Sequence, residues 1–312
     1  MKLRRRDFLA GSLAGAGALL AGRQPFTLAQ TLPQTYDPFE RVPLGKTGLK
    51  ITRVGMGTGV RGYMRSSNLV RQGKESAEKL VRDCFDHGVR WFDMADLYGT
   101  HPYVREGLKK VPRDEITLVS KIWVNRGGIP DTERPDADVV VNRFLKELDT
   151  DYLDLVLIHC QTRPDWIEQQ QDQMKIMEDL KRKGVIRAVG VSCHSLAALQ
   201  AAAKEPWVDS VHTRINPYGA VMDDSPAKVV PVLKEFKAHG KGVVGMKIIG
   251  EGRFTGDTDK INRSVDFALN LGCVDVVTVG FESIAQCDDF AKRVGQVPVR
   301  PWPEPIPDVR NS

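Results

Sequence analysis

One stretch of the sequence, VRWFDMADLYG at residues 89–99, changes from apolar to polar halfway along its length. Its apolar half is typical of a short buried strand, which Asp93 ends, and Tyr98 follows five residues later in a predicted loop. Two later apolar runs also end at an ionisable residue, the first at Lys121 and the second at His159. We therefore predict that these four ionisable side chains form a single site and that the rest of the chain is a scaffold for it.

Outward from this stretch, predicted strands and helices alternate along the chain. Apolar runs predict strands at residues 51–56, 89–93, 116–122, 153–158, 186–191, 208–215, 242–246 and 274–279. Helical spacing of apolar residues predicts helices at residues 75–87, 104–110, 137–148, 166–182, 196–203, 227–238, 262–271 and 284–294. Residues 41–49 contain a Gly-Lys-Thr-Gly turn, which indicates a hairpin before the first strand–helix unit.

Regular alternation of strands and helices indicates an α/β protein with a parallel sheet. Eight such units in about 250 residues have the size of a closed (β/α)8 TIM barrel, whose active site lies where the strands end. A doubly wound open sheet is the alternative, but no Gly-x-Gly-x-x-Gly follows the first strand. We predict a linker over residues 30–40 and a barrel with its N-terminal hairpin over residues 41–312.

The first 29 residues have the parts of an export signal. Basic residues precede a Gly/Ala-rich apolar run at 9–22, and small residues at 27–29 offer a cleavage point. The segment RRDFL at residues 5–9 resembles the twin-arginine signal, which directs folded proteins across the bacterial inner membrane. We expect a cleavable signal peptide, the twin-arginine export machinery as a partner, and a periplasmic or exported protein that is membrane-tethered if the signal is not cleaved. A short basic helix on a membrane surface is the alternative.

Composition argues against several classes of function. With 41% hydrophobic and 27% charged residues in 312, the balance is that of a globular protein. Residues 1–29 hold five of the 45 basic residues and one of the 40 acidic ones, so the net charge falls from +5 to +1 without them, which gives no support for nucleic-acid binding. Five cysteines without a Cys-x-x-Cys spacing argue against a disulfide framework or a metal site. No later segment is long and apolar enough to span a membrane.

The four ionisable residues suit carbonyl chemistry if they meet at the mouth of a barrel. A phenol is a poor acid at neutral pH, and the ammonium of Lys121 beside Tyr98 would lower the phenol pKa. Asp93 would keep the buried lysine charged, and a neutral His159 could donate a hydrogen bond to the same substrate oxygen. Such a group supplies a proton to a carbonyl oxygen while a nicotinamide cofactor supplies hydride to the carbon. Each residue alone more often has a structural role, so the prediction depends on the four together.

These residues and their surroundings resemble the aldo-keto reductase family, from Arg41 to about Phe290. The Asp-x-Ala-x-x-Tyr-Gly motif stands at residues 93–99, Ser-Lys-Ile at 120–122, and a very similar GVIRAVGVS segment at 184–192. The resemblance implies a (β/α)8 barrel that reduces an aldehyde or ketone to an alcohol with NADPH or NADH. It assigns Tyr98 as the proton donor, Asp93 and Lys121 as the groups that tune it, and His159 as the residue that orients the substrate.

The resemblance also implies a cofactor site on the loops around the barrel mouth. The residues expected to contact the cofactor are Gly57, Thr58, Ser192, His212, Lys247, Gly250, Ser283 and Gln286. Trp123 is expected to line the substrate pocket, and no metal is expected. His212 replaces the family's glutamine and can still donate a hydrogen bond, and Lys247 can pair with phosphate as a point charge.

The sequence indicates the choice between NADP and NAD less clearly. The family often places a basic residue against the 2′-phosphate of NADP near the last helix, where this chain has Glu282. Glu282 would repel a phosphate and could instead bond a ribose hydroxyl, although Lys292 or Arg293 could supply a positive charge. We expect NADP or NAD, with a slight preference for NADP, and a small carbonyl compound as the substrate.

Two other functions stay open. Cys193 and Met246 stand where the family has an asparagine and an aromatic residue beside the nicotinamide, which favours a non-catalytic barrel that senses nicotinamide or a carbonyl ligand. A metal-dependent hydrolase would need clustered ligands, and His159, His194 and His212 show no His-x-His or carboxylate-bridged pattern.

Overall fold

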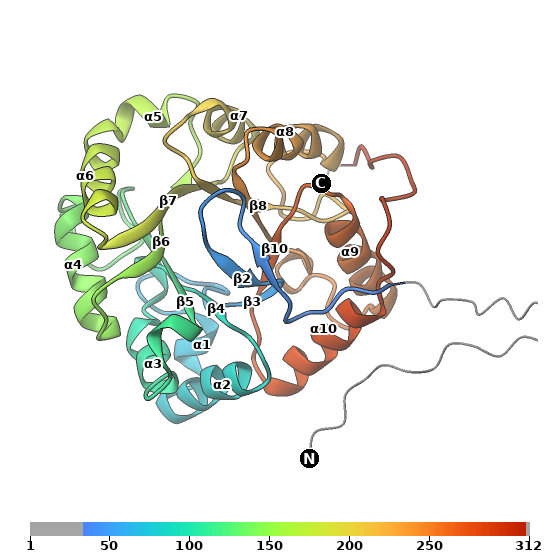
Figure 1. Ribbon diagram of the computed structural model, residues 1–312, viewed down its shortest axis with the longest axis horizontal. Helices are drawn as coiled ribbons and strands as arrows, with labels where there is room; N and C mark the ends of the chain where they lie inside the picture. The colour runs from blue at the N-terminus through green and yellow to red at the C-terminus, as the bar shows by residue number, and fades with distance from the viewer. Residues whose placement is uncertain (1–33, 310–312) are drawn as a thin grey trace, which may run out of the picture. The chain divides into compact units, whose positions relative to one another are not determined.

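Eight parallel strands close into a barrel in the computed structural model, which describes residues 34–309 (Figure 1). The strands follow one another around the ring in chain order, and β10 pairs with β3 to close it. They are β3 (Val54–Gly57), β4 (Trp91–Asp93), β5 (Thr117–Ile122), β6 (Leu153–Gln161), β7 (Ile186–Cys193), β8 (Ser210–Arg214), β9 (Gly242–Met246) and β10 (Val276–Val279). The predicted α/β barrel is therefore confirmed, and the open-sheet alternative is wrong.

Helices surround the barrel and connect successive strands, as Figure 1 shows. They are α1 (Asn68–Arg71), α2 (Lys74–Asp86), α3 (His101–Gly107), α4 (Ala137–Leu148), α5 (Trp166–Gln169), α6 (Gln171–Arg182), α7 (Leu196–Lys204), α8 (Pro226–Ala238), α9 (Thr258–Asn270) and α10 (Ile284–Gln296). The loops also contain the 3-10 turns η1 (Asp96–Tyr98), η2 (Arg113–Glu115) and η3 (Gly250–Gly252).

Three helices differ from the prediction by three residues or more, and one of them is α3, which spans His101–Gly107 rather than residues 104–110. The helix expected at residues 166–182 is interrupted at Gln170, whose backbone at φ −108° and ψ 12° departs from helical geometry. Helix α9 begins at Thr258 rather than at residue 262, because the Asp257 side chain accepts a hydrogen bond from the backbone N–H of Lys260 and caps the helix earlier.

The predicted N-terminal hairpin, β1 (Arg41–Pro43) and β2 (Lys50–Thr52), closes the end of the barrel at which the strands begin. Residues of the hairpin join an apolar cluster that fills the barrel interior. At the turn, Gly45 has φ +51°, and a Cβ atom there would lie 2.4 Å from the backbone nitrogen of Gly242. The close approach of the hairpin to β9 therefore requires glycine at this position.

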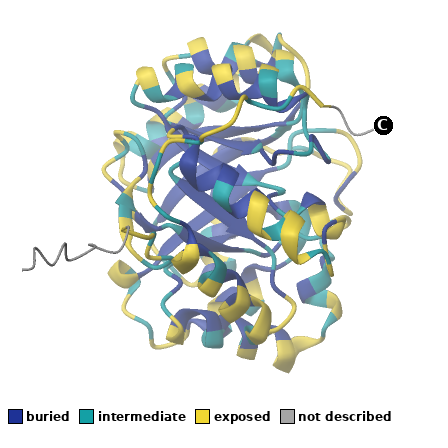
Figure 2. Ribbon diagram, turned by 90° about the vertical axis from the view of Figure 1, so that its right-hand side faces the viewer, coloured by how far each residue is buried: buried dark blue, intermediate teal, exposed yellow. Residues whose placement is uncertain are grey.

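Apolar burial holds the helices against the strands. All six residues of β5 are buried, and α4 turns Val140, Val141, Phe144 and Leu148 inward. Figure 2 shows buried residues on the strands and on the inner faces of the helices, with exposed residues outside. Burial of each large apolar side chain stabilises the fold by roughly 1.5–3 kcal/mol, so this core fixes where the strands end.

Residues 34–40, the described part of the linker predicted over residues 30–40, contact the barrel through two aromatic side chains. The Tyr36 hydroxyl donates a hydrogen bond to the carbonyl of Leu269 at 3.0 Å, and Phe39 packs against the core. These two aromatic side chains attach the segment to the barrel, which its polar composition did not indicate. The predicted signal peptide at residues 1–29 lies outside the described residues.

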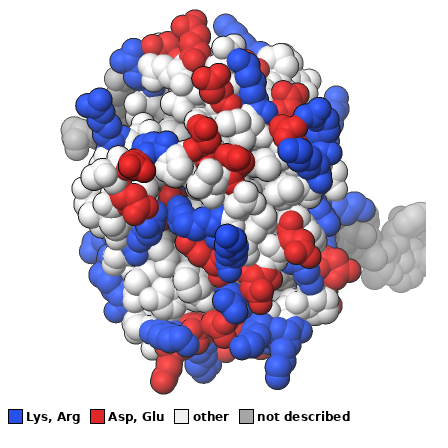
Figure 3. Space-filling model, turned by 90° about the vertical axis from the view of Figure 1, so that its left-hand side faces the viewer, with Lys and Arg blue, Asp and Glu red and all other residues white. Residues whose placement is uncertain are grey.

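Basic and acidic side chains are interspersed on the face shown in Figure 3. Within residues 34–309 no helix is long and apolar enough to cross a bilayer. The same part of the chain has no group of three or more His, Cys, Asp or Glu side chains placed to hold a metal ion. Its five cysteines are all free thiols.

A buried carboxylate at the start of β6 connects three neighbouring strands. Asp154 is 2% exposed and accepts a hydrogen bond from the backbone N–H of Leu118, the residue that follows Thr117 in β5, at 2.9 Å. Arg113 donates to it at 2.7 Å and Arg187 of β7 at 3.2 Å. Loss of this carboxylate would leave a buried N–H and a partly buried guanidinium without their partner.

We expect Asp154→Ala to lower the free energy of unfolding by about 3 kcal/mol, because it breaks a buried, hydrogen-bonded charge pair. Urea unfolding followed by circular dichroism measures this change. The matched control is Asp172→Ala, whose side chain is 90% exposed. The control should change the free energy by less than about 0.5 kcal/mol. Equal stability of the two variants would contradict the structural role of Asp154.

Candidate active site

The four ionisable residues meet at the open end of the barrel, where the strands end. Asp93 is the last residue of β4, Lys121 lies in β5, His159 lies in β6, and Tyr98 ends the η1 turn after β4. In each strand the residue two positions earlier belongs to the apolar cluster inside the barrel. Because strand side chains alternate with a period of two, the three strand residues face the same interior space.

A buried ion pair lies at the centre of the site. The Lys121 ammonium donates hydrogen bonds to the Asp93 carboxylate and, at 2.8 Å, to the carbonyl of Met94. The Lys121 nitrogen is 4.9 Å from the centre of the Tyr98 ring. The Tyr98 hydroxyl lies 3.3 Å from Nε2 of His159. The phenol is therefore adjacent to both a buried cation and an imidazole.

Burial controls the charge of three of these groups. It lowers the pKa of His159 well below its ordinary value, and the charge of Lys121 adds to that effect, so the imidazole is neutral at pH 7. Burial also lowers the pKa of Lys121, which the Asp93 carboxylate opposes. Burial alone would raise the pKa of Asp93, but the nearby Lys121 and His212 hold that pKa below its ordinary value. The result is a neutral histidine beside an ion-paired lysine.

The pKa of Tyr98 differs from the prediction. Burial raises it well above its ordinary value of 10, and the charge of Asp93 raises it further. The net shift is therefore upward rather than the predicted lowering by Lys121, whose ammonium pairs with Asp93 and lies 4.9 Å from the centre of the phenol ring. Tyr98 therefore keeps its proton at neutral pH, which is the form that a proton donor requires.

His212 lies below the ion pair rather than on a cofactor surface. It is fully buried in β8, its ring stacks on Trp91 at 5.9 Å, and its Nε2 is 3.4 Å from a carboxylate oxygen of Asp93. His212 lies outside the cavity lining, and its contact with the cofactor stays a prediction. His212 helps to position Asp93, a role that needs the strand register and cannot be inferred from the residue type.

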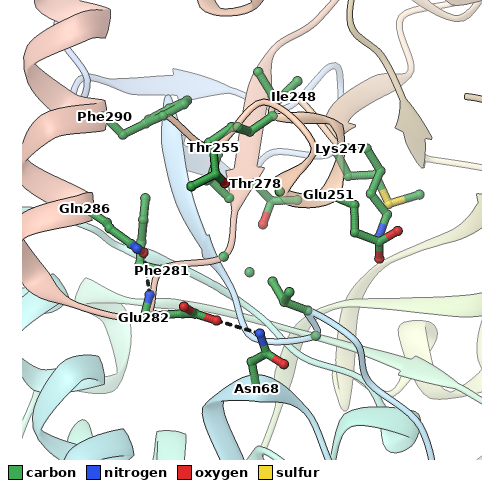
Figure 4. Close-up of a pocket in the computed structure, with 18 of the residues that line it drawn as sticks. Asn68, Lys247, Ile248, Glu251, Thr255, Thr278, Phe281, Glu282, Gln286 and Phe290 are labelled. Atoms are coloured by element: carbon green, nitrogen blue, oxygen red, sulfur yellow. Dashed lines mark hydrogen bonds and ion pairs between the residues drawn. The ribbon is translucent and has the colours of Figure 1, made fainter. Parts of the chain in front are cut away.

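A cavity of about 740 Å³ opens beside the site. Its lining begins at Asp93 and Tyr98 and extends to α10, where Glu282, Gln286 and Arg293 contribute. Figure 4 shows the part of this lining formed by the β9–α9 loop, the start of α10 and Asn68. The volume lies in the range of roughly 300–1,000 Å³ that is typical of cofactor and ligand sites.

The predicted cofactor residues divide into two groups. Those that line the cavity are Gly57, Thr58, Lys247 and Gln286. Those outside its lining are Ser192, His212, Gly250 and Ser283. Ser192 is buried and accepts a hydrogen bond from the Cys160 backbone at 2.8 Å, so its hydroxyl is already engaged inside the barrel. Ser283 is exposed at the N-cap of α10.

Lys247 is not a free phosphate ligand, because its ammonium donates to the carboxylate of Glu251 at 2.6 Å. Figure 4 shows the two side chains facing each other. The predicted substrate-pocket residue Trp123 is half-buried, and its ring meets that of His159 edge-on at 5.3 Å. Trp123 therefore forms a wall next to the imidazole, outside the lining of the larger cavity.

Two glycines and a carboxylate that were not predicted hold Tyr98 in place. A Cβ atom at Gly59 would lie 2.3 Å from the Tyr98 ring, and one at Gly62 would lie 2.5 Å from it. The buried carboxylate of Asp96, in the same turn as Tyr98, accepts from Arg65 at 2.8 Å and from Arg143 at 2.7 Å. Glycines after the first strand were visible in the sequence, but their contact with this ring was not.

The buried histidines make the fold sensitive to acid. His159 and His212 both have a pKa lowered mainly by burial, so the unfolded chain binds protons between pH 6.5 and 5 that the folded chain does not. We expect the free energy of unfolding to fall with decreasing pH by up to about 1.4 kcal/mol per pH unit for each of the two groups.

Urea unfolding at several pH values between 7 and 5 measures this dependence, and Asp223, whose pKa burial raises to about 6, is the carboxylate that also titrates there. His159→Gln and His212→Gln cannot take up a proton, so each should make the dependence shallower. An unchanged slope in both variants would show that other groups cause the loss of stability.

Comparisons with known proteins agree with the geometry. A protein-family profile described as "Aldo/keto reductase family" matches residues 54–296. "Aldo-keto reductase YhdN" of Bacillus subtilis is 27% identical over 233 residues, which are 70% of this chain and 67% of that protein. "Glyoxal reductase" of the same organism is 31% identical over 155 residues, 47% of this chain and 52% of that protein. The chain thus spans about half to two thirds of the length of these relatives.

Among solved structures, a putative aldo-keto reductase from Pseudomonas aeruginosa superposes with a TM-score of 0.68 at 24% identity, covering 86% of this chain and 98% of that one. At this identity the likeness supports the barrel fold rather than a particular activity.

Proposed function

The chain belongs to the aldo/keto reductase family, and on that premise we propose that it reduces a small aldehyde or ketone to an alcohol with a proton from Tyr98. Membership of the family makes it an NAD(P)-dependent oxidoreductase. The observation that carries the proposal is the convergence of a protonated phenol, a buried Lys121–Asp93 pair and a neutral His159 beside one cavity.

The cavity fits a nicotinamide dinucleotide. Gly57, Gly59 and Gly280 line it and leave the backbone open to a bound sugar or phosphate. Met246 stands at the lining where the family has an aromatic residue, and its flexible thioether can pack against a planar ring. When bound, the nicotinamide supplies hydride to the carbonyl carbon.

The protein's own residues would move a single proton at the substrate oxygen. The Tyr98 hydroxyl donates it, and the nearby Lys121 ammonium stabilises the phenolate that is left. Asp93 keeps that ammonium charged against the effect of burial. The neutral imidazole of His159 can donate a second hydrogen bond and so fixes the position of the oxygen. The walls formed by Trp123 and His159 suit a small substrate, such as the dicarbonyl after which the glyoxal reductase of Bacillus subtilis is named.

We expect Tyr98→Phe to lower kcat by about 10²–10⁴-fold, because it removes the general acid. Cofactor affinity should stay within about threefold of the wild type, since only one oxygen is lost from the cavity. Reduction of glyoxal, methylglyoxal and glyceraldehyde followed by cofactor absorbance, with cofactor binding by fluorescence, measures both.

Tyr103→Phe is the matched control, because Tyr103 loses the same atom but packs against the core. Its kcat should equal that of the wild type. Wild-type protein that binds cofactor but turns over no carbonyl compound would instead support the sensing barrel. Wild-type protein that binds neither NADH nor NADPH would contradict the reductase proposal.

We also propose that residues 1–29 direct the folded barrel across the inner membrane with its cofactor bound. The twin-arginine segment and the free thiols of the barrel support this route, because the chain would fold before export.

Replacing both Arg5 and Arg6 by lysine should retain the protein in the cytoplasm. Fractionation and N-terminal sequencing of the exported protein, with a start expected near Gln30, test this. Equal export of the variant would contradict it.

A further inference from the structure

We propose that this chain binds NAD(H) in preference to NADP(H), with the Asn68–Glu282 pair as the discriminating group. The inference rests on the proposed function, because it concerns the adenosine end of the same cavity. Since Asp93 and Tyr98 mark the reacting end, the lining at α10 is left for the adenosine half. The charges at that end therefore decide whether a 2′-phosphate is accepted.

A fixed carboxylate occupies the α10 end of the cavity. Oε1 of Glu282 accepts a hydrogen bond from the Asn68 side chain at 2.5 Å, as Figure 4 shows. The backbone of Glu282 donates to Gln286 at 2.8 Å and accepts from Gln72 at 3.3 Å. Asn68 is itself held, because its side-chain oxygen accepts from Arg71 at 2.6 Å. Glu282 is thus anchored from both α1 and α10.

This arrangement suits a ribose hydroxyl better than a phosphate. Asn68 engages one oxygen of Glu282, and the other oxygen stays available to accept a hydrogen bond from a 2′-hydroxyl. A 2′-phosphate is mostly doubly ionised at neutral pH and would lie against a carboxylate of the same charge. The positive end of α10 would otherwise attract a phosphate, but Glu282, directly before the Ser283 N-cap, already supplies an anion there.

The basic residue of α10 at the cavity does not compensate for this carboxylate. Arg293 forms two contacts with Asp289, at 2.7 and 3.1 Å, and donates to Asn262 at 2.6 Å. Its charge is therefore already paired. Arg61 also lines the cavity, and Arg71 contacts Asn68 at 2.6 Å. Neither has an ion pair among residues 34–309, so these two cations can compete with the proposed effect.

Cofactor fluorescence titrations of the purified full chain, with NADH and NADPH at equal ionic strength, test the proposal without turnover. We expect NADH to bind at least about tenfold more tightly than NADPH, because like charges placed together are strongly unfavourable. Glu282→Gln keeps the shape and removes the charge, so it should tighten NADPH binding about tenfold and change NADH binding by less than about threefold. High salt should reduce the wild-type preference.

Asp288→Asn is the matched control, because it also converts a carboxylate to an amide, on α10 but outside the cavity lining. It should leave both affinities unchanged. A wild type that binds NADPH more tightly than NADH would overturn the proposal, and so would an unchanged NADPH affinity in Glu282→Gln. In either case, loss of NADPH binding in Arg61→Ala would identify Arg61 as the phosphate ligand. A wild type that binds NADPH more tightly than NADH and still reduces carbonyl compounds would refute only this inference, whereas a wild type that binds neither cofactor would refute the proposed function.

Discussion

The buried ion pair between Lys121 and Asp93 is the constraint on which the site depends. Lys121 is 1% exposed and Asp93 is 4% exposed, so each charge has lost nearly all its hydration. Such a pair is tolerated only when further hydrogen bonds complete it, and here the carbonyl of Met94 accepts one from Lys121. Nε2 of His212 lies 3.4 Å from the Asp93 carboxylate on the other side. Removal of either charge would leave the other uncompensated in the barrel interior. The pair therefore fixes both the geometry of β4 and β5 and the electrostatics around the phenol.

The register of the strands brings these charges together. Asp93 pairs with Val119 across β4 and β5, and Lys121 lies two residues further along the same face. Trp91 and Val119 belong to the apolar cluster directly below. The inward-facing side chains thus change from apolar to charged within two residues along β4 and β5. The apolar layer has a low dielectric, which strengthens the electrostatic interaction between Lys121 and Asp93.

The sequence predicted the parts of this arrangement that depend on local pattern. Alternation of strands and helices indicates a barrel, and an ionisable residue at the end of an apolar run indicates a strand end at its mouth. Contacts between distant segments were not accessible in this way. The support of Asp93 by His212, the pairing of Lys247 with Glu251, and the docking of residues 34–40 all depend on register or loop conformation.

The predicted effect of Lys121 on the Tyr98 pKa failed for an instructive reason. The prediction considered the ammonium and the phenol as an isolated pair, whereas in the structure the ammonium donates to the Asp93 carboxylate and lies 4.9 Å from the centre of the phenol ring. The Asp93 carboxylate offsets the positive charge of Lys121, so burial is the largest effect on the Tyr98 pKa. A phenol that keeps its proton until an oxygen atom arrives, beside a cation that can stabilise the phenolate afterwards, is better suited to proton donation than one already ionised.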